Sequence, residues 1–237
     1  MSLDEVCDAI IDLLPHSENN LGFVSPTHFV LQMISIVEEL RKRGHFPTII
    51  YNTNGYDLPE TIRLLEGIVD VWLPDFKYSD NNLAEALSQA PEYSRYALTS
   101  LKEMMRQTGT TLHTDDRGVA RRGIIIRHLV LPGYLENSMG VLKQTAEHLS
   151  PNLHISLMSQ YYPNDRHTNS KFETATKEQD QSRTPSVGTQ FANRKSLHRP
   201  ITRKEYESVV DAFYALGFTR GWLQEYESHR TYRPDFS

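Results

Sequence analysis

The sequence predicts an α/β fold, a (β/α) barrel or partial barrel that forms a single domain over residues 1–237. Short apolar runs alternate with helical patterns about every 25 to 30 residues, which is typical of parallel βαβ units. The apolar runs are nearly continuous, as expected for strands covered on both faces. No glycine-rich phosphate-binding turn follows the first predicted strand, so the pattern favours a barrel over an open doubly wound sheet.

Individual elements follow from hydrophobic periodicity and from residues typical of helix ends. Ser2 and Glu5 predict a capping box at the start of the first helix. Thr202 and Glu205 predict another at the start of the last helix. The predicted helices cover residues 3–14, 29–43, 59–65, 81–90, 92–108, 136–149 and 203–216. The predicted strands cover residues 21–24, 48–51, 69–73, 124–131, 153–158 and 222–225, with a polar hairpin or loop at 109–121.

Residues 163–200 interrupt this pattern. The segment is rich in Asn, Asp, Thr, Ser, Gln, Lys and Arg and contains few large apolar side chains. Such a composition buries too little surface to offset the entropy of ordering the chain. We therefore expect a flexible polar insertion within the barrel domain, with a lid or docking loop as the functional alternative.

Composition limits the classes of function. The net charge of −5 argues against a nucleic-acid surface, because such surfaces are usually basic. No apolar run approaches the roughly 20 residues that a membrane span needs, and the acidic N-terminal helix is not a secretory signal. We expect a cytoplasmic protein with no membrane or nucleic-acid partner. Cys7 is the one cysteine, which excludes an intrachain disulfide and predicts a buried structural thiol.

Asp75 and Lys77 follow the third predicted strand on either side of Phe76. Because side chains alternate along a strand, both can point toward the mouth of a barrel, where ligands bind. A carboxylate beside an ammonium group can bind a zwitterionic or hydroxyl-bearing ligand. The alternative is an ion pair that stabilises the rim.

Asn52 and Asn54 follow the second predicted strand and precede Gly55. Both amides lie on one face if the strand continues, where they could bind ribose hydroxyls or a carboxylate. The alternative is simple turn chemistry, because Asn-Gly is a common turn dipeptide.

Ser25, Thr27 and His28 follow the first predicted strand. Ser and Thr at a helix start can bind an anion or a carboxylate, or can simply cap the helix. His28 could ligate a metal, although a lone histidine is more often solvated or hydrogen bonded.

Arg127 and His128 lie inside an apolar strand, so one must face the barrel interior and the other the helices. A buried cation needs a partner. Arg127 could bind an acidic ligand, or could pair with Asp70 or Asp75. We expect solvated side chains for the polar loop that carries His113, Asp115 and Asp116, because no zinc-like spacing supports a metal site.

Taken in order, several segments make the chain resemble the radical S-adenosylmethionine proteins, in the branch related to pyruvate formate-lyase activating enzymes. The resemblance extends from about residue 3 to the C-terminus, as a run of motifs in order. The segments are Ser25-Pro26-Thr27-His28-Phe29, Tyr51-Asn52-Thr53-Asn54-Gly55-Tyr56, Leu73-Pro74-Asp75-Phe76-Lys77-Tyr78, 127–133, 155–161, 222–225 and 233–236.

This resemblance implies a partial barrel of six strand–helix units with S-adenosylmethionine at the carboxyl ends of the strands. It places Ser25, Pro26 and Thr27 near the methionine amino group. It places Asn52 and Asn54 near the ribose or methionine moiety, Asp75 and Lys77 against the cofactor or substrate, and Arg127 on the cofactor's carboxylate side. Relatives often carry an acid at the position of Asn52, so this chain does not favour a monovalent-cation site there.

The family's Cys-x-x-x-Cys-x-x-Cys motif, which holds a [4Fe–4S] cluster, has no counterpart in this sequence. The resemblance implies that the chain starts near the helix after the cluster loop, without the first barrel strand. We therefore expect no catalytic residues and no metal ligands in these 237 residues, and an inactive chain unless the cluster region is supplied. A complete protein would act on a glycyl radical enzyme and accept electrons from a flavodoxin or ferredoxin.

The same residues also fit two alternatives. One is a non-catalytic barrel remnant that binds a nucleotide-like ligand or a partner protein. The other is an unrelated barrel hydrolase that would use His28, Asp75, Lys77 and His128 with a metal.

Overall fold

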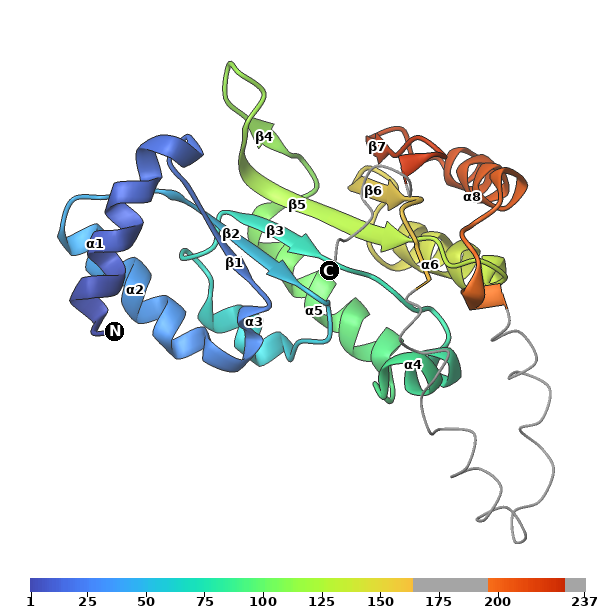
Figure 1. Ribbon diagram of the computed structural model, residues 1–237, viewed down its shortest axis with the longest axis horizontal. Helices are drawn as coiled ribbons and strands as arrows, with labels where there is room; N and C mark the ends of the chain where they lie inside the picture. Colours follow the sequence, from blue (N-terminus) through green and yellow to red (C-terminus); the bar gives the residue numbers. More distant parts are fainter. Residues whose placement is uncertain (164–195, 229–237) are drawn as a thin grey trace, which may run out of the picture.

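The computed structural model of the protein describes residues 1–163 and 196–228 (Figure 1). Its centre is a seven-stranded sheet in which six strands run parallel in the order β1-β2-β3-β5-β6-β7, and β4 pairs antiparallel with β5. The strands are β1 Asn20–Val24, β2 Thr48–Thr53, β3 Val71–Pro74, β4 His113–Thr114, β5 Ala120–Leu129, β6 His154–Met158 and β7 Gly221–Leu223. Within the described residues β1 and β7 do not pair, so the sheet is open and the predicted partial barrel is confirmed.

The helices lie where periodicity predicts them, with small shifts at their ends. They are α1 Leu3–Leu13, α2 Val30–Lys42, α3 Pro59–Leu64, α4 Asn81–Ser88, α5 Tyr93–Thr108, α6 Leu135–His148 and α8 Arg203–Ala215. Both predicted capping boxes are present, one between Ser2 and Glu5 and one between Thr202 and Glu205. The 3-10 helices η1 Leu14–Ser17 and η2 Pro26–Phe29 connect β1 to the helices on either side of it.

The predicted hairpin or loop before β5 is a short hairpin. The strand β5 begins at Ala120, before the predicted start at residue 124, and its first residues pair with β4. Hydrophobic periodicity missed this start because the hairpin projects beyond the sheet, where Arg121 and Arg122 occupy strand positions that are not part of the apolar core.

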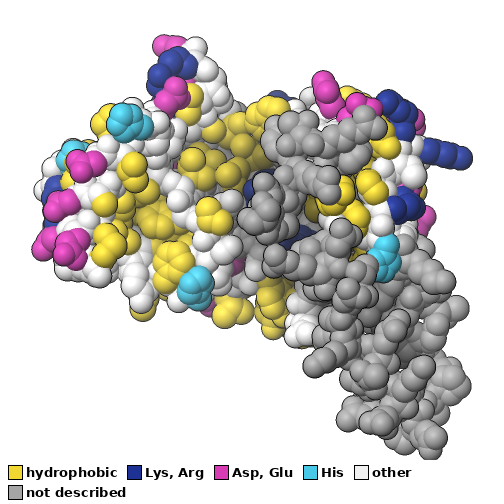
Figure 2. Space-filling view, in the orientation of Figure 1, with side chains coloured by type: hydrophobic (Ala, Val, Ile, Leu, Met, Phe, Trp, Pro, Cys, Tyr) yellow, Lys and Arg dark blue, Asp and Glu magenta, His cyan; other side chains and the backbone are white. Residues whose placement is uncertain are grey.

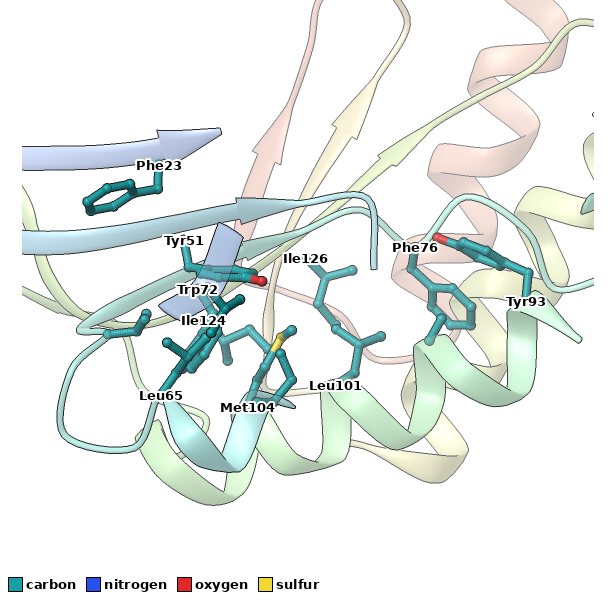
Figure 3. Packing of buried hydrophobic residues seen from close by; sticks show 14 of the residues in the cluster. Phe23, Tyr51, Leu65, Trp72, Phe76, Tyr93, Leu101, Met104, Ile124 and Ile126 are labelled. Atoms are coloured by element: carbon teal, nitrogen blue, oxygen red, sulfur yellow. The ribbon is translucent and has the colours of Figure 1, made fainter. Parts of the chain in front are cut away.

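A large hydrophobic cluster lies between the sheet and helices α2, α3 and α5. In Figure 3 the side chains of Trp72 and Ile126 point from the strands toward Leu101 and Met104 on α5. All four side chains are fully buried or nearly so. Buried apolar side chains such as these supply most of the stabilisation from burial. A second cluster packs α6 and α8 against β5, β6 and β7. Cys7 is completely buried beside α2, as predicted for a structural thiol.

The opposite face of the sheet, here called the open face, is only partly covered. Along β2, Thr48–Thr53, its residues alternate with buried ones, so that every second side chain is buried. Val24 is 69% exposed and Trp222 is 52% exposed. Figure 2 shows hydrophobic side chains gathered over this face, while most acidic and histidine side chains lie around its margin.

The predicted insertion at residues 163–200 lies mostly outside the described residues, and the closing segment 233–236 lies wholly outside them. Of the insertion, the structure describes Pro163 and residues 196–200. Division of the chain into one domain with an insertion therefore stays a prediction. No helix in the described part of the chain has both the length and the apolar character needed to cross a membrane.

Candidate functional site

Asp75 and Arg127 meet at the carboxyl end of the sheet because they occupy matching positions on neighbouring strands. Val71 pairs with Gly123 in the β3–β5 ladder, and the same register brings Asp75 to Arg127 in an isolated bridge. Arg127 Nη2 lies 2.7 Å from Asp75 Oδ1. The ion pair considered in the sequence analysis is therefore present, and its acid is Asp75. Asp70 instead accepts a hydrogen bond from the backbone N–H of Ile49.

Two further side chains complete a polar cluster of Asn52, Asp75, Lys77 and Arg127. Arg127 Nη2 donates a hydrogen bond to Asn52 Oδ1 over 2.6 Å. Lys77 Nζ lies 3.5 Å from Asp75 Oδ2, and the lysine side chain is 42% exposed. The predicted common direction of Asp75 and Lys77 is thus present, in the form of an ion pair. The cluster presents two cations, one carboxylate and one amide at the carboxyl ends of β2, β3 and β5.

The polar cluster retains hydrogen-bonding capacity that the protein does not use. Arg127 Nε and Asp75 Oδ1 are buried atoms without a hydrogen-bond partner among the described residues. The contact of Asp75 Oδ1 with Arg127 has ion-pair distance but lacks the angles of a hydrogen bond. For Arg127 Nε, which has no such contact, the expected cost is about 1–3 kcal/mol, and buried polar atoms of this kind are uncommon unless they meet water or a ligand.

Asn54 does not join the cluster. Its Oδ1 accepts a hydrogen bond from the backbone N–H of Tyr56 over 2.9 Å, which is the turn chemistry considered as the alternative. Ser25 is exposed, has a left-handed backbone with φ 52°, and makes no capping hydrogen bond. Pro26 is buried in the following turn. These residues lie at the carboxyl end of the sheet, as predicted. Their contact with a ligand stays a prediction.

Thr27 belongs to a network that sequence reasoning missed. Asp57, only 1% exposed, accepts hydrogen bonds from Thr27 Oγ1 at 2.7 Å, from Thr53 Oγ1 at 2.5 Å and from the Tyr51 hydroxyl at 3.4 Å. This carboxylate therefore joins the loop after β1 to the loop after β2. Burial, followed by the negative charge of Asp57, raises the pKa of Tyr51 well above its usual value. An isolated Asp after an Asn-Gly turn has no sequence signal that distinguishes it from an ordinary loop residue.

Arg127 and His128 point in opposite directions, as alternation along the strand predicts, and the structure places His128 toward the helices. Its ring is completely buried, with Nδ1 2.7 Å from the carbonyl oxygen of Phe76 and Nε2 2.9 Å from Ser138 Oγ. A carbonyl can only accept, so Nδ1 carries the proton and Nε2 accepts from Ser138. Burial lowers the pKa of His128 to about 4, which keeps the ring neutral near pH 7. Neither ring nitrogen is free to act on a substrate.

The loop with His113, Asp115 and Asp116 forms the hairpin. Asp115 accepts hydrogen bonds from Arg121 and from the backbone N–H groups of Arg117 and Val119. The Arg121 hydrogen bond is the main reason that the pKa of Asp115 is lowered. No group of three or more His, Cys, Asp or Glu side chains in residues 1–163 and 196–228 could hold a metal ion.

Comparisons with known proteins place the fold. No protein-family model matches the chain. A stretch of 146 residues, 61% of this chain, is 28% identical to an uncharacterized protein of Methanocaldococcus jannaschii, and the match spans 38% of that relative's length. The structure resembles the crystal structure of a domain of a pyruvate-formate lyase-activating enzyme from Bacteroides vulgatus, with a TM-score of 0.52 and 13% sequence identity. That superposition covers 87% of this chain and 99% of the other. The chain therefore shares the fold of a domain of a pyruvate-formate lyase-activating enzyme.

Proposed function

We propose that the chain is a radical S-adenosylmethionine-type domain that binds S-adenosylmethionine at the carboxyl end of its sheet. The observation that carries the proposal is the polar cluster of Asn52, Asp75, Lys77 and Arg127, with Arg127 Nε and Asp75 Oδ1 buried and without hydrogen-bond partners among the described residues. Ligands of barrel-like α/β folds bind at this edge. The shared fold with a domain of a pyruvate-formate lyase-activating enzyme supports the same site.

The ligand's functional groups match the groups in the cluster. S-Adenosylmethionine has a carboxylate, an ammonium group, a sulfonium and a ribose diol. In the proposal, Arg127 and Lys77 bind the carboxylate, because a charge-assisted hydrogen bond to an anion is stronger than a neutral one. Asp75 accepts from the ammonium group or the ribose hydroxyls, and Asn52 accepts or donates according to its amide orientation. Ser25, Pro26, Thr27 and Asn54 would line the same edge.

The residues of this chain do not fit a [4Fe–4S] cluster. Three thiolates hold such a cluster in the family, whereas the sequence contains Cys7 alone. Cys7 is buried under α2, and burial raises the pKa of its thiol, which makes it a poor metal ligand. Ligands for a [4Fe–4S] cluster would have to come from residues outside this sequence or from another chain. We therefore assign no catalytic step to the residues of this chain.

The wider setting follows from the same proposal. With a [4Fe–4S] cluster supplied, the reaction class would be one-electron reductive cleavage of S-adenosylmethionine to methionine and a 5′-deoxyadenosyl radical, in the cytoplasm. The protein substrate would be a glycyl radical enzyme, and a flavodoxin or ferredoxin would donate the electron. The second candidate, a non-catalytic nucleotide- or protein-binding barrel, is favoured by the single cysteine.

Calorimetric titration with S-adenosylmethionine tests the proposal. Asp75→Asn keeps the shape of the side chain but removes its charge, so we expect at least tenfold weaker binding, about 1.4 kcal/mol, with little change in the free energy of unfolding. Asp115→Asn is the matched control, because Asp115 also pairs with an arginine but lies in the hairpin. It should leave the affinity unchanged.

Three results would contradict the proposal or redirect it. Wild-type protein that binds no S-adenosylmethionine at millimolar concentration would contradict it. Equal affinity for ATP and S-adenosylmethionine would favour the nucleotide-binding module. If Asp75→Asn lost stability in proportion to its loss of binding, the result would show that the polar cluster is a structural ion-pair network.

A further inference from the structure

The segment Asp75-Phe76-Lys77 leaves β3 without forming regular secondary structure, yet its backbone is held at every polar group. The N–H groups of Asp75 and Phe76 donate to the carbonyls of Thr53 and Arg127 on the two neighbouring strands. The N–H of Lys77 and all three carbonyls bond to side chains instead. Irregular backbone that is fully bonded in this way is held in one conformation.

Three buried side chains from three different elements supply those bonds. Tyr93 on α5 is 2% exposed, His128 on β5 is 0% exposed and Asn137 on α6 is 5% exposed. His128 donates to the carbonyl of Phe76, and Asn137 Nδ2 donates to the carbonyl of Lys77 over 2.9 Å. The position of the Asp75–Lys77 pair therefore depends on side chains that do not belong to the polar cluster.

The Tyr93 hydroxyl makes the largest number of these contacts. It accepts from the backbone N–H of Lys77 at 3.0 Å, and it lies 2.8 Å from the carbonyl oxygen of Asn54 and 3.0 Å from that of Asp75. A hydroxyl has one proton to donate, which the two carbonyls share. Burial raises the pKa of Tyr93 far above its usual value, so this proton is retained. In Figure 3 the Tyr93 ring lies next to Phe76.

Gly55 makes this arrangement sterically possible. Its φ is +78°, and a Cβ built there would lie 2.1 Å from the carbonyl oxygen of Asp75 and 3.2 Å from the Tyr93 hydroxyl. The turn after β2 and the segment after β3 therefore lie too close together to leave room for a side chain at residue 55, with the tyrosine oxygen at their junction. A residue with a side chain at this position would force them apart.

We propose that Tyr93 is a positioning residue whose hydroxyl holds the turn after β2 against the Asp75–Lys77 segment and thereby sets the geometry of the polar cluster. The inference rests on the proposed function in so far as the cluster binds S-adenosylmethionine. Tyr93 itself contacts backbone groups, and it acts on the ligand through the two charged side chains that it positions.

The variant Tyr93→Phe removes one oxygen and keeps the ring. We expect hydrogen exchange at the Lys77 amide to become at least tenfold faster, and the dissociation constant for S-adenosylmethionine to rise about tenfold. Tyr206→Phe is the matched control, because the Tyr206 hydroxyl is also buried and lies 3.2 Å and 2.7 Å from the backbone carbonyls of Leu157 and Gln224. It should lower the melting temperature by a similar amount and leave both readouts unchanged.

The two readouts separate this inference from the proposed function. If wild-type protein binds no S-adenosylmethionine, the proposed function is wrong, and amide exchange at Lys77 still decides the role of Tyr93. If Tyr93→Phe matches Tyr206→Phe in both exchange and affinity, Tyr93 only stabilises the fold and the inference is overturned. If Tyr93→Phe does not fold, NMR spectroscopy of the wild-type protein decides the role of Tyr93. A slowly exchanging Tyr93 hydroxyl proton with a nuclear Overhauser effect to the Lys77 amide supports the inference, and its absence refutes it.

Discussion

Arg121 and Arg127 are six residues apart on β5, an even spacing that places both on the open face of the sheet, and they differ in how completely they are bonded. Arg121, at the amino end, donates to Asp115 through Nε and Nη2. Its Nη1 donates to the carbonyl of Glu18 and to the side chains of Asn20 and Thr48. Arg127, at the carboxyl end, has an Nε atom that is buried and lacks a hydrogen-bond partner among the described residues.

The difference separates a structural arginine from a candidate ligand-binding one. All three side-chain nitrogens of Arg121 are bonded within the protein, and together they join the hairpin to the starts of β1 and β2. Arg127 has equally close partners, but its Nε is unused, and its Nη2 approaches Asp75 Oδ1 to 2.7 Å without hydrogen-bond geometry. Since folding alone would favour satisfied groups, unused capacity at the ligand-binding edge of the fold supports a site there.

Gly55→Ala should produce the largest effect. It tests whether the backbone at the carboxyl end of the sheet is as rigid as the backbone at the amino end of the sheet. The new Cβ would lie 2.1 Å from a backbone oxygen at a φ of +78°, so we expect the free energy of unfolding to fall by about 4 kcal/mol. Gly22→Ala is the control, because a Cβ there meets nothing within 4 Å, and it should change stability by less than about 1 kcal/mol. Urea denaturation measures both. Equal effects would mean that the carboxyl end adapts easily.

The pH dependence of stability should produce the next largest effect, through His128, which anchors the carbonyl of Phe76. Its pKa is about 4 in the folded protein and near 6.5 in the unfolded chain, so the unfolded chain binds more protons between these values. The contribution of His128 to the free energy of unfolding is then fully present above pH 6.5. It falls by about 3 kcal/mol as the pH drops to 4. His128→Asn retains a donor for Phe76 but does not titrate. Denaturant titrations from pH 4 to 7 should give it a much flatter profile, and parallel profiles would refute this assignment.

Exchanging the two arginines for glutamine should produce the smallest effects and directly tests the comparison. Arg121→Gln removes several charge-assisted hydrogen bonds, so we expect a loss of about 2 kcal/mol in the free energy of unfolding and unchanged affinity for S-adenosylmethionine. Arg127→Gln should cost about 1 kcal/mol or less and weaken binding about tenfold. Denaturation and calorimetry on both variants are required. The reverse pattern of effects would show that Arg127 is structural.

The sequence by itself determined the order and type of most elements, with the exception of β4 and the start of β5. Alternating apolar runs and amphipathic segments predicted the parallel strands and the helices, because hydrophobic periodicity depends on local geometry. The same alternation predicted that Arg127 and His128 point to opposite faces and that Asp75 and Lys77 share one direction. Capping boxes at Ser2 and Thr202 were also predictable, since a capping box lies within four consecutive residues.

Tertiary structure decided which distant residues meet. The pairing of Arg127 with Asp75 rather than Asp70 depends on the register of β3 against β5, which no local pattern encodes. The roles of Asp57 and Tyr93 depend on packing between loops and helices far apart in the sequence, where a lone Asp or Tyr has no distinguishing pattern. Local periodicity records which face a side chain occupies, whereas its partner on that face depends on how the strands and helices pack together.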